Sequence, residues 1–402
     1  MTVDTDWSLP QDLGPLLARA TELAALRPRY AHVDTSRPVR LADLPVLTKD
    51  DFAAARADLL ARARAESAGS VVLGSGGTTS RPKLSVLPSE MFLPDMLTAW
   101  TPLDADDVLL NCNNGGELGS MNPFYNRLAH CSGAAVVPLG MIDPDALAAW
   151  LNFIADCGIT AIGGTPSYLA TVLECYESLG LRPPFRKVVW TGEAYNQSAR
   201  RTTERVLPDA QRFGVYGSTE TWVVGHNGPG CGWDVFHPMH YQHVELVDGH
   251  IVVTTTHPRS LNPILRYQIG DRGEWTACPC GRPEPGLRVL GRADQQIKFR
   301  SILFLPEEIQ HIALTDPDVR DVQISLFDHG TPGERIEVRL RVGADADAPA
   351  VEERVGKLLM DQMYRIRYEV DDEPEAFATR VVSRFFVNHR TNKTPLLVKE
   401  IS

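Results

Sequence analysis

The chain has 402 residues, 43% of them hydrophobic, and a formal net charge of −11 at pH 7. This length and composition are sufficient for two or three domains with sizeable cores. The acidic balance argues against nucleic acid and anionic membranes as general partners, because both need a broad basic field on the protein. A local basic run at Arg200, Arg201 and Arg205 is interpreted as a solvated helix face.

The seven cysteines are odd in number and spread along the chain, which is typical of reduced thiols rather than of a disulfide framework. No basic N-terminal segment precedes an apolar stretch, and no window approaches 18 uninterrupted apolar residues. We therefore expect a cytoplasmic protein that is neither exported nor inserted in a membrane.

The N-terminal half alternates between helices and strands. Polar-faced helices are predicted first, over residues 13–26 and 49–66, with a connector at 38–45 between them. The strands expected next are 107–112, 134–139, 159–163 and 187–190, and the expected helices are 88–100, 143–156, 166–179 and 196–206. Strands separated by helices imply right-handed crossovers and a largely parallel sheet, so this half is α/β.

The texture becomes β-rich from about Gly214, where runs at 244–247, 250–256 and 264–267 are joined by turn signals. We expect a small antiparallel layer or barrel there. The tail predicts an α+β domain, with a helix opened by Pro306, a second helix over 350–365, and strands over 322–327, 336–342 and 380–387. The predicted domains are residues 1–291, with the β-rich subdomain at about 214–290, and residues 292–402.

The stretch 71–86 reads VVLGSGGTTSRPKLSV. Its glycines permit backbone N–H groups to turn around an anion, its hydroxyls add donors, and Arg81 and Lys83 add positive charge. It matches neither the Walker A pattern nor Gly-x-Gly-x-x-Gly opening a helix. Two interpretations remain open for this glycine loop: a cradle for a polyphosphate, or a solvent loop between two strands.

Four later segments place carboxylates beside small or hydroxylated residues, often directly after an expected strand. Alone, each is more typical of a turn or a cap than of a ligand site. Their order along the chain strengthens a functional interpretation. They are TGEAY at 191–195, VYGSTE at 215–220, RYQIGD at 266–271 and GRADQQIKFR at 291–300.

In this order, the segments resemble the core motifs of the adenylate-forming superfamily, which includes acyl-CoA and aryl-CoA ligases, peptide-synthetase adenylation domains and firefly luciferase. From about residue 70 to the C-terminus, the chain looks most like the phenylacetate-CoA ligase group. Compact length and CPCGR at 278–282 favour that group. The resemblance rests on SGGTTSRPK (75–83), GGTPSY (163–168), GEAY (192–195), YGSTE (216–220), YQIGD (267–271) and GRADQQIK (291–298).

The resemblance implies an ATP- and Mg²⁺-dependent enzyme that converts an aromatic or small carboxylic acid to acyl-AMP, releases pyrophosphate and transfers the acyl group to CoA. Such catalysis depends on positioning and on neutralising phosphate charge. Two alternatives stay open. In one, a stand-alone adenylating enzyme passes acyl-AMP to an amine or a carrier-protein thiol; in the other, an inactive homologue binds nucleotide for regulation. A homodimer is also left open.

By the same resemblance, the glycine loop holds the β- and γ-phosphates, Glu220 binds Mg²⁺, and Thr219 meets the α-phosphate. Adenine lies along Glu193 and Ala194, and Asp271 accepts hydrogen bonds from both ribose hydroxyls, since a carboxylate presents two acceptors. The residues implied in nucleotide binding are Ser75, Gly76, Gly77, Thr78, Thr79, Lys83, Gly192, Glu193, Ala194, Tyr216, Gly217, Ser218, Asp271, Arg292 and Lys298.

In this superfamily the small C-terminal domain is mobile and swings about a hinge that matches Asp294. The adenylation lysine of its last loop matches Lys393, with Lys399 as the alternative, and a cation there stabilises charge developing on the transferring oxygens. An exposed tail residue is the other interpretation of either lysine. Ser301 stands where glycine is usual on the pantetheine tunnel, which puts CoA transfer in doubt but not adenylation.

Cys231, His237, Cys278 and Cys280 resemble a structural zinc site of the phenylacetate-CoA ligase group, since thiolates and imidazole suit tetrahedral Zn²⁺. The alternative is a set of buried thiols beside an unrelated histidine, for which His226, His240 and His243 compete with His237.

The acyl pocket is expected between the motifs, and Tyr125 and Trp222 beside small residues suit a flat aromatic or compact acid. Both aromatics are equally well explained as core residues. The expected pocket residues are Asn113, Gly115, Gly116, Tyr125, Gly164 and Trp222.

Overall fold

The computed structural model describes residues 9–75, 83–292, 297–300, 302–331, 333–371, 373–388 and 393–400. The chain forms two compact units, Met1–Arg292 and Ala293–Ser402. Among the described residues, no helix combines the length and the apolar character that crossing a bilayer requires.

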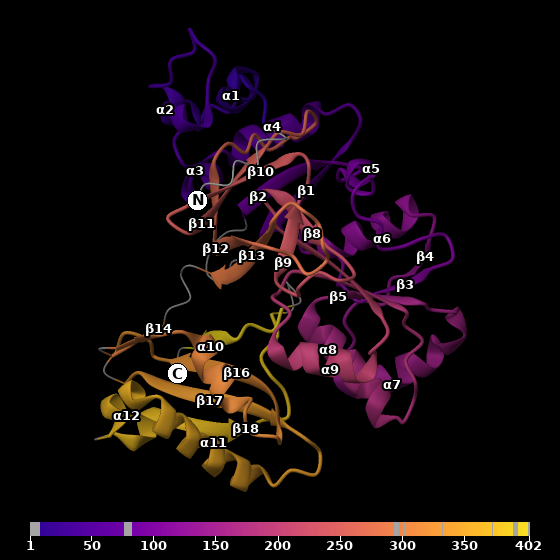
Figure 1. Ribbon diagram of the computed structural model, residues 1–402, viewed down its shortest axis with the longest axis vertical. Helices are drawn as coiled ribbons and strands as arrows, with labels where there is room; N and C mark the ends of the chain where they lie inside the picture. The colour runs from indigo at the N-terminus through magenta and orange to yellow at the C-terminus, as the bar shows by residue number, and fades with distance from the viewer. Residues whose placement is uncertain are drawn as a thin grey trace. The chain divides into compact units, whose positions relative to one another are not determined.

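In the described part of the first unit, eleven strands form one sheet (Figure 1). Its parallel part contains the four strands that the α/β pattern predicted, followed by one more. In spatial order these are β4 (Ala135–Val137), β3 (Val108–Asn111), β5 (Ala161–Gly164), β6 (Lys187–Thr191) and β7 (Gln211–Ser218). The predicted α/β class is therefore confirmed.

The β-rich segment continues the same sheet with antiparallel strands, as expected for a small antiparallel layer. It joins the parallel part through β8 and the short strand β9, rather than standing apart as a separate barrel. The strands follow in the order β8 (Trp222–Asn227), β9 (Val235–Pro238), β13 (Gly286–Arg292), β12 (Tyr267–Thr276), β11 (His250–Thr255) and β10 (Gln242–Val247).

Helices cover both faces of the parallel part. Consecutive residues of a strand point to opposite faces, so a strand in which neighbouring residues are all apolar needs cover on both sides. Leu109 and Val189 pack in one cluster with α6 (Met121–Cys131). Leu110 and Val188 face the other side, where α7, α8 and α9 lie together (Figure 1). These three are Pro144–Phe153, Pro166–Ser178 and Gln197–Val206, with a short 3₁₀ turn, η2, at Ala155–Cys157.

The N-terminal segment packs on the antiparallel part, where Leu17, Phe52 and Leu59 share a cluster with Ile251 and Tyr267. The helix predicted over 13–26 ends early, at Thr21, and a further short helix begins only at Arg27, whereas the helix predicted over 49–66 is divided in two. The observed elements are α1 (Gly14–Thr21), α2 (Arg27–Tyr30), η1 (Leu41–Asp43), α3 (Lys49–Ala54) and α4 (Arg56–Ala65).

Along the chain, the N-terminal helices are followed by an antiparallel hairpin and a single-turn helix before the first strand of the sheet. These elements are β1 (Ser70–Ser75), β2 (Lys83–Pro88) and α5 (Leu93–Met96). The helix predicted over 88–100 is wrong over most of its length, since only Leu93–Met96 is helical. Met91 and Phe92 adopt left-handed backbone conformations, with φ of 55° and 57°, which a helix cannot include. Both side chains are nevertheless buried, which explains their helix-like apolar pattern.

The second unit is an α+β fold. A small hairpin, β14 (Ile297–Phe299) with β15 (Ile302–Phe304), precedes a sheet of strand order β18-β17-β16-β19. These strands are Phe377–Val381, Arg335–Val342, Val319–Phe327 and Leu397–Glu400, and the helical elements are α10 (Pro306–Ala313), α11 (Ala348–Gln362), α12 (Tyr364–Val370) and η3 (Pro374–Ala376).

The last strand predicted, over 380–387, is wrong over most of its length. β18 ends at Val381, and the backbone of Phe386 instead pairs with the buried side chain of Gln323, which donates to its carbonyl at 2.9 Å and accepts from its N–H at 2.8 Å. The last strand of the sheet is instead β19, which pairs in parallel with β16 on the edge opposite β17.

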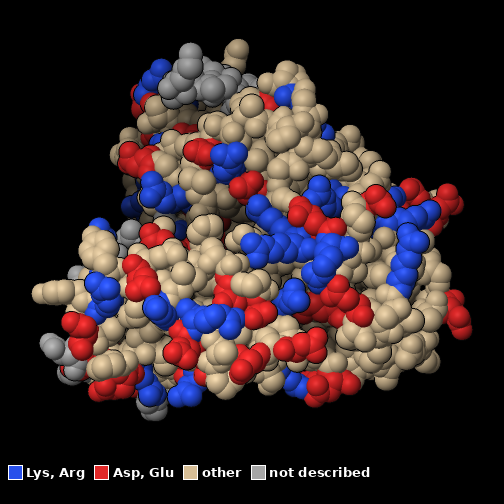
Figure 2. Space-filling model, turned by 60° about the horizontal axis from the view of Figure 1, so that its bottom comes forward, with Lys and Arg blue, Asp and Glu red and all other residues tan. Residues whose placement is uncertain are grey.

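The basic run on α9 is tied to its neighbours rather than simply solvated. Arg205 donates to both carboxylate oxygens of Glu177 on α8, at 2.8 and 2.7 Å. Arg200 donates to the carbonyl of Tyr195 and lies over the ring of Trp233. Lys and Arg groups likewise lie close to Asp and Glu groups over the face shown in Figure 2.

A buried carboxylate joins the strands of the parallel sheet at their N-terminal ends. Asp107 precedes β3 and accepts hydrogen bonds from Lys187 Nζ at the start of β6, at 2.6 Å, and from Thr160 Oγ1 before β5, at 2.7 Å. Burial alone raises the pKa of Asp107, but these hydrogen bonds outweigh it, so the pKa lies below its usual value. The carboxylate is therefore ionised and paired.

Replacing the buried cation tests this network. Lys187→Met is expected to lower the free energy of unfolding at pH 7 by about 3–5 kcal/mol, because it leaves the buried Asp107 charged without its ammonium partner. The folded pKa of Asp107 is below the unfolded value of about 3.9, so the pair stabilises the fold above about pH 4 and loses this effect as the pH falls further. Urea unfolding at both pH values measures it.

Arg186→Met is the matched control. Arg186 lies 3.5 Å from the same carboxylate but is 63% exposed. Its loss should cost less than about 1 kcal/mol. Equal effects of the two substitutions would contradict the importance given to Lys187.

Candidate functional site

Three of the predicted nucleotide-binding residues meet across the sheet. Tyr216 on β7 donates its hydroxyl to Asp271 Oδ2 on β12, at 2.7 Å. Arg292 on β13 is the register partner of Asp271 and places Nη1 3.7 Å from Oδ1. Burial, and then the charge of Asp271, raise the pKa of Tyr216, so its hydroxyl stays a donor. The carboxylate is thereby fixed in orientation.

A second predicted carboxylate links the ends of β5 and β6. Glu193 follows β6 through Gly192, whose φ of +88° favours glycine. Its Oε2 accepts a hydrogen bond of 3.2 Å from the backbone N–H of Ser167 in the first turn of α8. A helix N-terminus favours a negative charge, so this position suits the Glu193 carboxylate.

The segment after β7 forms a tight turn that carries Glu220. A β-carbon added to Gly217 would lie 2.0 Å from the carbonyl oxygen of Trp222, so the turn requires glycine there. The hydroxyls of Ser218 and Thr221 lie 3.0 Å apart and close the turn. Glu220 itself is 7% exposed. The pKa of Tyr267 is raised mainly by the burial of Tyr267 and secondly by the charge of Glu220. Thr219, beside it, is half-buried.

The glycine loop connects β1 and β2, whose terminal residues Ser75 and Lys83 are paired in register. Gly76, Gly77, Thr78 and Thr79 lie outside the described residues. The N–H of Gly74 donates to the carbonyl of Leu118 at 2.9 Å. This bond places the start of the loop beside the segment that follows β3, where acyl-pocket residues were predicted.

The predicted pocket aromatics both lie in the hydrophobic core. Tyr125 is 0% exposed, donates to the carbonyl of Val189 at 3.1 Å, and leaves only 2.4 Å for a β-carbon at Gly163. Trp222 is buried, donates to the carbonyl of Met91 at 3.0 Å, and meets Phe124 edge to face. These contacts match the core interpretation of the two rings.

The smaller predicted pocket residues differ from one another. Asn113 is buried, whereas Gly115 and Gly116 are exposed. Gly164 is packed closely, since a β-carbon there would lie 3.3 Å from Cys112 and 3.4 Å from Leu169. The small residue at 164 is therefore explained by packing alone, and its place in a pocket stays a prediction.

The predicted residues of the second unit occupy its surface. Lys298 is exposed on β14, and Lys399 is exposed on β19. Lys393 is exposed in a bridge with Asn388, whose N–H donates to the Lys393 carbonyl at 2.8 Å. The predicted hinge Asp294 and the unusual Ser301 lie outside the described residues.

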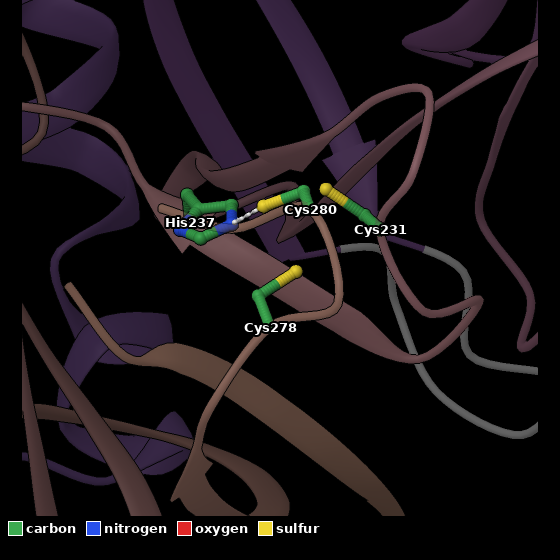
Figure 3. Close-up of side chains that lie close together, drawn as sticks. All are labelled: Cys231, His237, Cys278 and Cys280. Atoms are coloured by element: carbon green, nitrogen blue, oxygen red, sulfur yellow. Dashed lines mark hydrogen bonds between the residues drawn. The ribbon is translucent and has the colours of Figure 1, made fainter. Parts of the chain in front are cut away.

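The four predicted metal ligands come together (Figure 3). Cys231 lies between β8 and β9, His237 on β9, and Cys278 and Cys280 between β12 and β13, and their ligand atoms all lie within 4.8 Å of one another. Cys280 Sγ is 3.3 Å from His237 Nε2. Burial lowers the pKa of His237, which favours the neutral, metal-binding imidazole. His226, His240 and His243 are not part of this cluster.

The family of AMP-binding enzymes matches residues 20–253, more than half of the sequence. The chain belongs to this family. The matched part contains the hairpin, the parallel sheet, Glu193 and the turn at Glu220. The resemblance to the adenylate-forming superfamily near the phenylacetate-CoA ligases is confirmed by the relatives.

Two related AMP-binding enzymes carry the name phenylacetate-coenzyme A ligase. The one from Thermus thermophilus is 26% identical over 217 residues, which are 48% of this chain and 46% of that ligase. The one from Aromatoleum evansii is 22% identical over 310 residues, 69% of this chain and 66% of that ligase. The matches thus span less than two thirds of either relative.

A solved structure shows the same fold. The crystal structure of 2-hydroxyisobutyryl-CoA ligase, in the postadenylation state with 2-HIB-AMP, matches with a TM-score of 0.72 at 16% identity. The match covers 96% of this chain and 88% of that one.

One residue of this AMP-binding enzyme was missed in the sequence. Asn262 is 2% exposed and joins the strand after the glycine loop to the turn of Glu220. Its Nδ2 donates to Ser85 Oγ at 2.6 Å and to the Glu220 carbonyl at 3.1 Å, and its Oδ1 accepts from the N–H of Val86 at 3.0 Å. Asn before Pro signals only a turn, so the sequence carried no sign of this role.

We expect Asn262→Ala to weaken binding of ATP with Mg²⁺ about tenfold, a loss of about 1.4 kcal/mol, because the loop strand and the Glu220 turn lose their common anchor. Titration calorimetry measures the affinity. Asn227→Ala is the control, since Asn227 is also buried but bonds to Gly232. An unchanged affinity in Asn262→Ala would contradict the positioning role.

Proposed function

We propose that the chain is an ATP-dependent, AMP-forming ligase that activates an aromatic or small carboxylic acid as acyl-AMP and transfers the acyl group to CoA. The observation that carries the proposal is the Asp271 carboxylate, oriented by Tyr216 and Arg292 in a chain of the AMP-binding family. Two carboxylate oxygens match the two hydroxyls of a ribose. The shared name of the two relatives supports CoA as the acceptor.

The proposed nucleotide site extends along the carboxyl ends of the strands, where open α/β sheets bind ligands. Adenine lies along Gly192, Glu193 and Ala194 after β6, and the α-phosphate meets Thr219 after β7. The β- and γ-phosphates occupy the glycine loop. Mg²⁺, when bound, offsets the phosphate charge, and the buried Glu220 carboxylate suits such a cation because Mg²⁺ prefers oxygen ligands.

In the first step, a carboxylate oxygen of the acid forms a bond to the α-phosphorus, and the bond from that phosphorus to the bridging oxygen breaks, so pyrophosphate leaves. In the second, the CoA sulfur forms a bond to the acyl carbon, the bond from that carbon to the phosphate oxygen of AMP breaks, and AMP and the thiol proton are released. Lys393 is proposed to stabilise the negative charge on the transferring oxygens during the first step, where a fixed cation acts most strongly. Lys399 is the alternative.

Acid-dependent exchange of pyrophosphate into ATP tests the first step. We expect exchange with at least one acid of an aryl and short-chain panel, and a loss of about 10²–10³-fold in Lys393→Ala, the effect typical of removing one transition-state contact. Lys399→Ala is the matched control, because this lysine is also exposed in the same unit. A larger loss in Lys399→Ala would reverse the two assignments.

Product analysis then decides the acceptor. A CoA thioester is expected when CoA is added to acid, ATP and Mg²⁺. Acyl-AMP without a CoA thioester would favour an amine or carrier-protein thiol instead. ATP binding without exchange for any acid would favour the regulatory homologue.

We also propose that Cys231, His237, Cys278 and Cys280 hold a structural Zn²⁺. Three sulfurs and one imidazole are a ligand set that zinc prefers, and a tetrahedral site with bonds of about 2.3 Å separates its sulfurs by about 3.8 Å. The separation of at most 4.8 Å between the ligand atoms fits such a site after small adjustments. All four positions are filled by protein, which is typical of structural rather than catalytic zinc.

Metal analysis tests this assignment. The purified chain should contain about one zinc, and Cys278→Ser should lose most of it and lower the melting temperature, because metal binding contributes to folding. Cys157→Ser is the control, since Cys157 is exposed and outside the cluster. Equal zinc content in both variants would refute the site.

A further inference from the structure

The carboxyl end of β3 carries a network of asparagine side chains. Asn111 Nδ2 donates to the carbonyl of Asn122 at 3.1 Å and to Asn126 Oδ1 at 2.9 Å. Asn111 Oδ1 accepts from the N–H of Asn113 at 3.1 Å and from Asn113 Nδ2 at 3.0 Å. The network therefore holds the amide of Asn113 in one orientation.

One atom of this network has no partner. Asn113 is 1% exposed, and its Oδ1 is buried without a hydrogen bond. The assignment of the oxygen follows from backbone groups, which cannot be flipped. The backbone N–H of Asn113 can only donate, so the side-chain atom of Asn111 that it contacts must be the oxygen, Oδ1. The side-chain atom of Asn113 that contacts the same Oδ1 must then be its nitrogen, Nδ2. The free atom is thus an acceptor.

A second such atom lies at the same edge of the sheet. The hydroxyl of Ser167 is buried and unpartnered, and Ser167 is the second residue of α8, which follows β5 closely. β5 is the parallel neighbour of β3, with Asn111 opposite Gly163. A buried carbonyl without a donor costs about 1–3 kcal/mol, which a ligand with a suitable donor recovers.

We propose that the acid activated by this chain carries a hydroxyl or amino group, which donates a hydrogen bond to Asn113 Oδ1. This inference rests on the proposed ligase function and specifies its substrate class. The ionised carboxylate of the acid has no proton to donate, so the donor must be a second polar group. Tyr125 and Trp222 are core residues, so these two rings do not restrict the acid to a flat aromatic or compact one.

The donor belongs to the acid rather than to adenine. Adenine is proposed to lie after β6, whereas Asn113 follows β3, two strands away across β5. Neighbouring strands are about 4.8 Å apart, so the two positions differ by about 10 Å. The start of the glycine loop contacts the segment after Asn113 through the bond from Gly74 to Leu118, which keeps the acid near the phosphates.

Matched acids test the proposal by pyrophosphate exchange. Each set compares three acids: one that carries a donor group, its fluoro analogue and its unsubstituted parent. In the aryl sets, 2-, 3- and 4-hydroxybenzoate and 2-aminobenzoate are compared with the fluorobenzoates and benzoate. In the short-chain set, lactate is compared with 2-fluoropropionate and propionate. We expect kcat/KM for the best donor acid to exceed that of its fluoro analogue and its parent at least tenfold. Asn113→Leu should reduce this ratio to within about twofold, because leucine has similar size but no acceptor.

Asn126→Leu is the control variant. Asn126 belongs to the same network, but its substitution leaves Asn113 Oδ1 in place. It should keep the preference ratio even where total exchange falls. Loss of the ratio in both variants would indicate a general disturbance and overturn the role of Asn113.

Three further outcomes would overturn the proposal. If the unaltered chain shows equal kcat/KM within every matched set, the donor group on the acid is refuted but the ligase function is not. If no acid supports exchange, both the donor group and the ligase function are refuted. If the unaltered chain prefers ATP over the triphosphate of purine riboside, which lacks the 6-amino group, and Asn113→Leu abolishes that preference, the donor is adenine instead.

Discussion

The site depends on how one short strand joins two kinds of sheet. β9 pairs with β8 on one side, through His226 opposite His237, and with β13 on the other, through Phe236 opposite Leu287. Tyr216 of β7 packs its ring against Phe236, with centroids 5.5 Å apart, and reaches Asp271 on β12 with its hydroxyl. The orientation of the Asp271 carboxylate therefore requires that β9 keep the two parts of the sheet in register.

The proposed zinc site acts on the same strand. His237 lies on β9, and the cysteines come from the connections that enter β9 and β13. A β-carbon added to Gly286, at the start of β13, would lie only 2.4 Å from a side-chain carbon of Val235 on β9, so the close approach of these strands requires glycine there. A metal that ties these connections together would stabilise a junction that has few ladder hydrogen bonds of its own.

The sequence predicted the parts of this fold that depend on local periodicity. Strands β3, β4, β5 and β6 and helices α7, α8 and α9 lie close to their predicted ranges, whereas β7 was not predicted as a strand. Helix α6 was missed, because Asn122 and Pro123 in its first turn signal a loop, although proline is tolerated there. The final strand was misplaced because a buried glutamine, rather than a strand, pairs with Phe386.

The candidate site was predictable where residue type alone suggests chemistry. Motif order brought Tyr216, Asp271 and Arg292 together, and ligand type brought together the four zinc candidates. Asn262 could not be recognised, because its three partners lie about 40 and 180 residues away in sequence. The core positions of Tyr125 and Trp222 were also undecidable, since an aromatic ring suits a pocket and a core equally well.

The two ends of the parallel sheet carry different networks of polar side chains. At the N-terminal end, the Asp107 carboxylate is paired with Lys187 and Thr160, an arrangement that stabilises the fold and leaves nothing for a ligand. At the carboxyl end, Asn113 and Ser167 keep unpartnered buried atoms at a cost in stability. Ser132, in the turn before β4 at the N-terminal end, also has a buried hydroxyl without a partner. The case for the carboxyl end therefore rests on two such atoms after neighbouring strands, at the edge where open α/β sheets bind ligands.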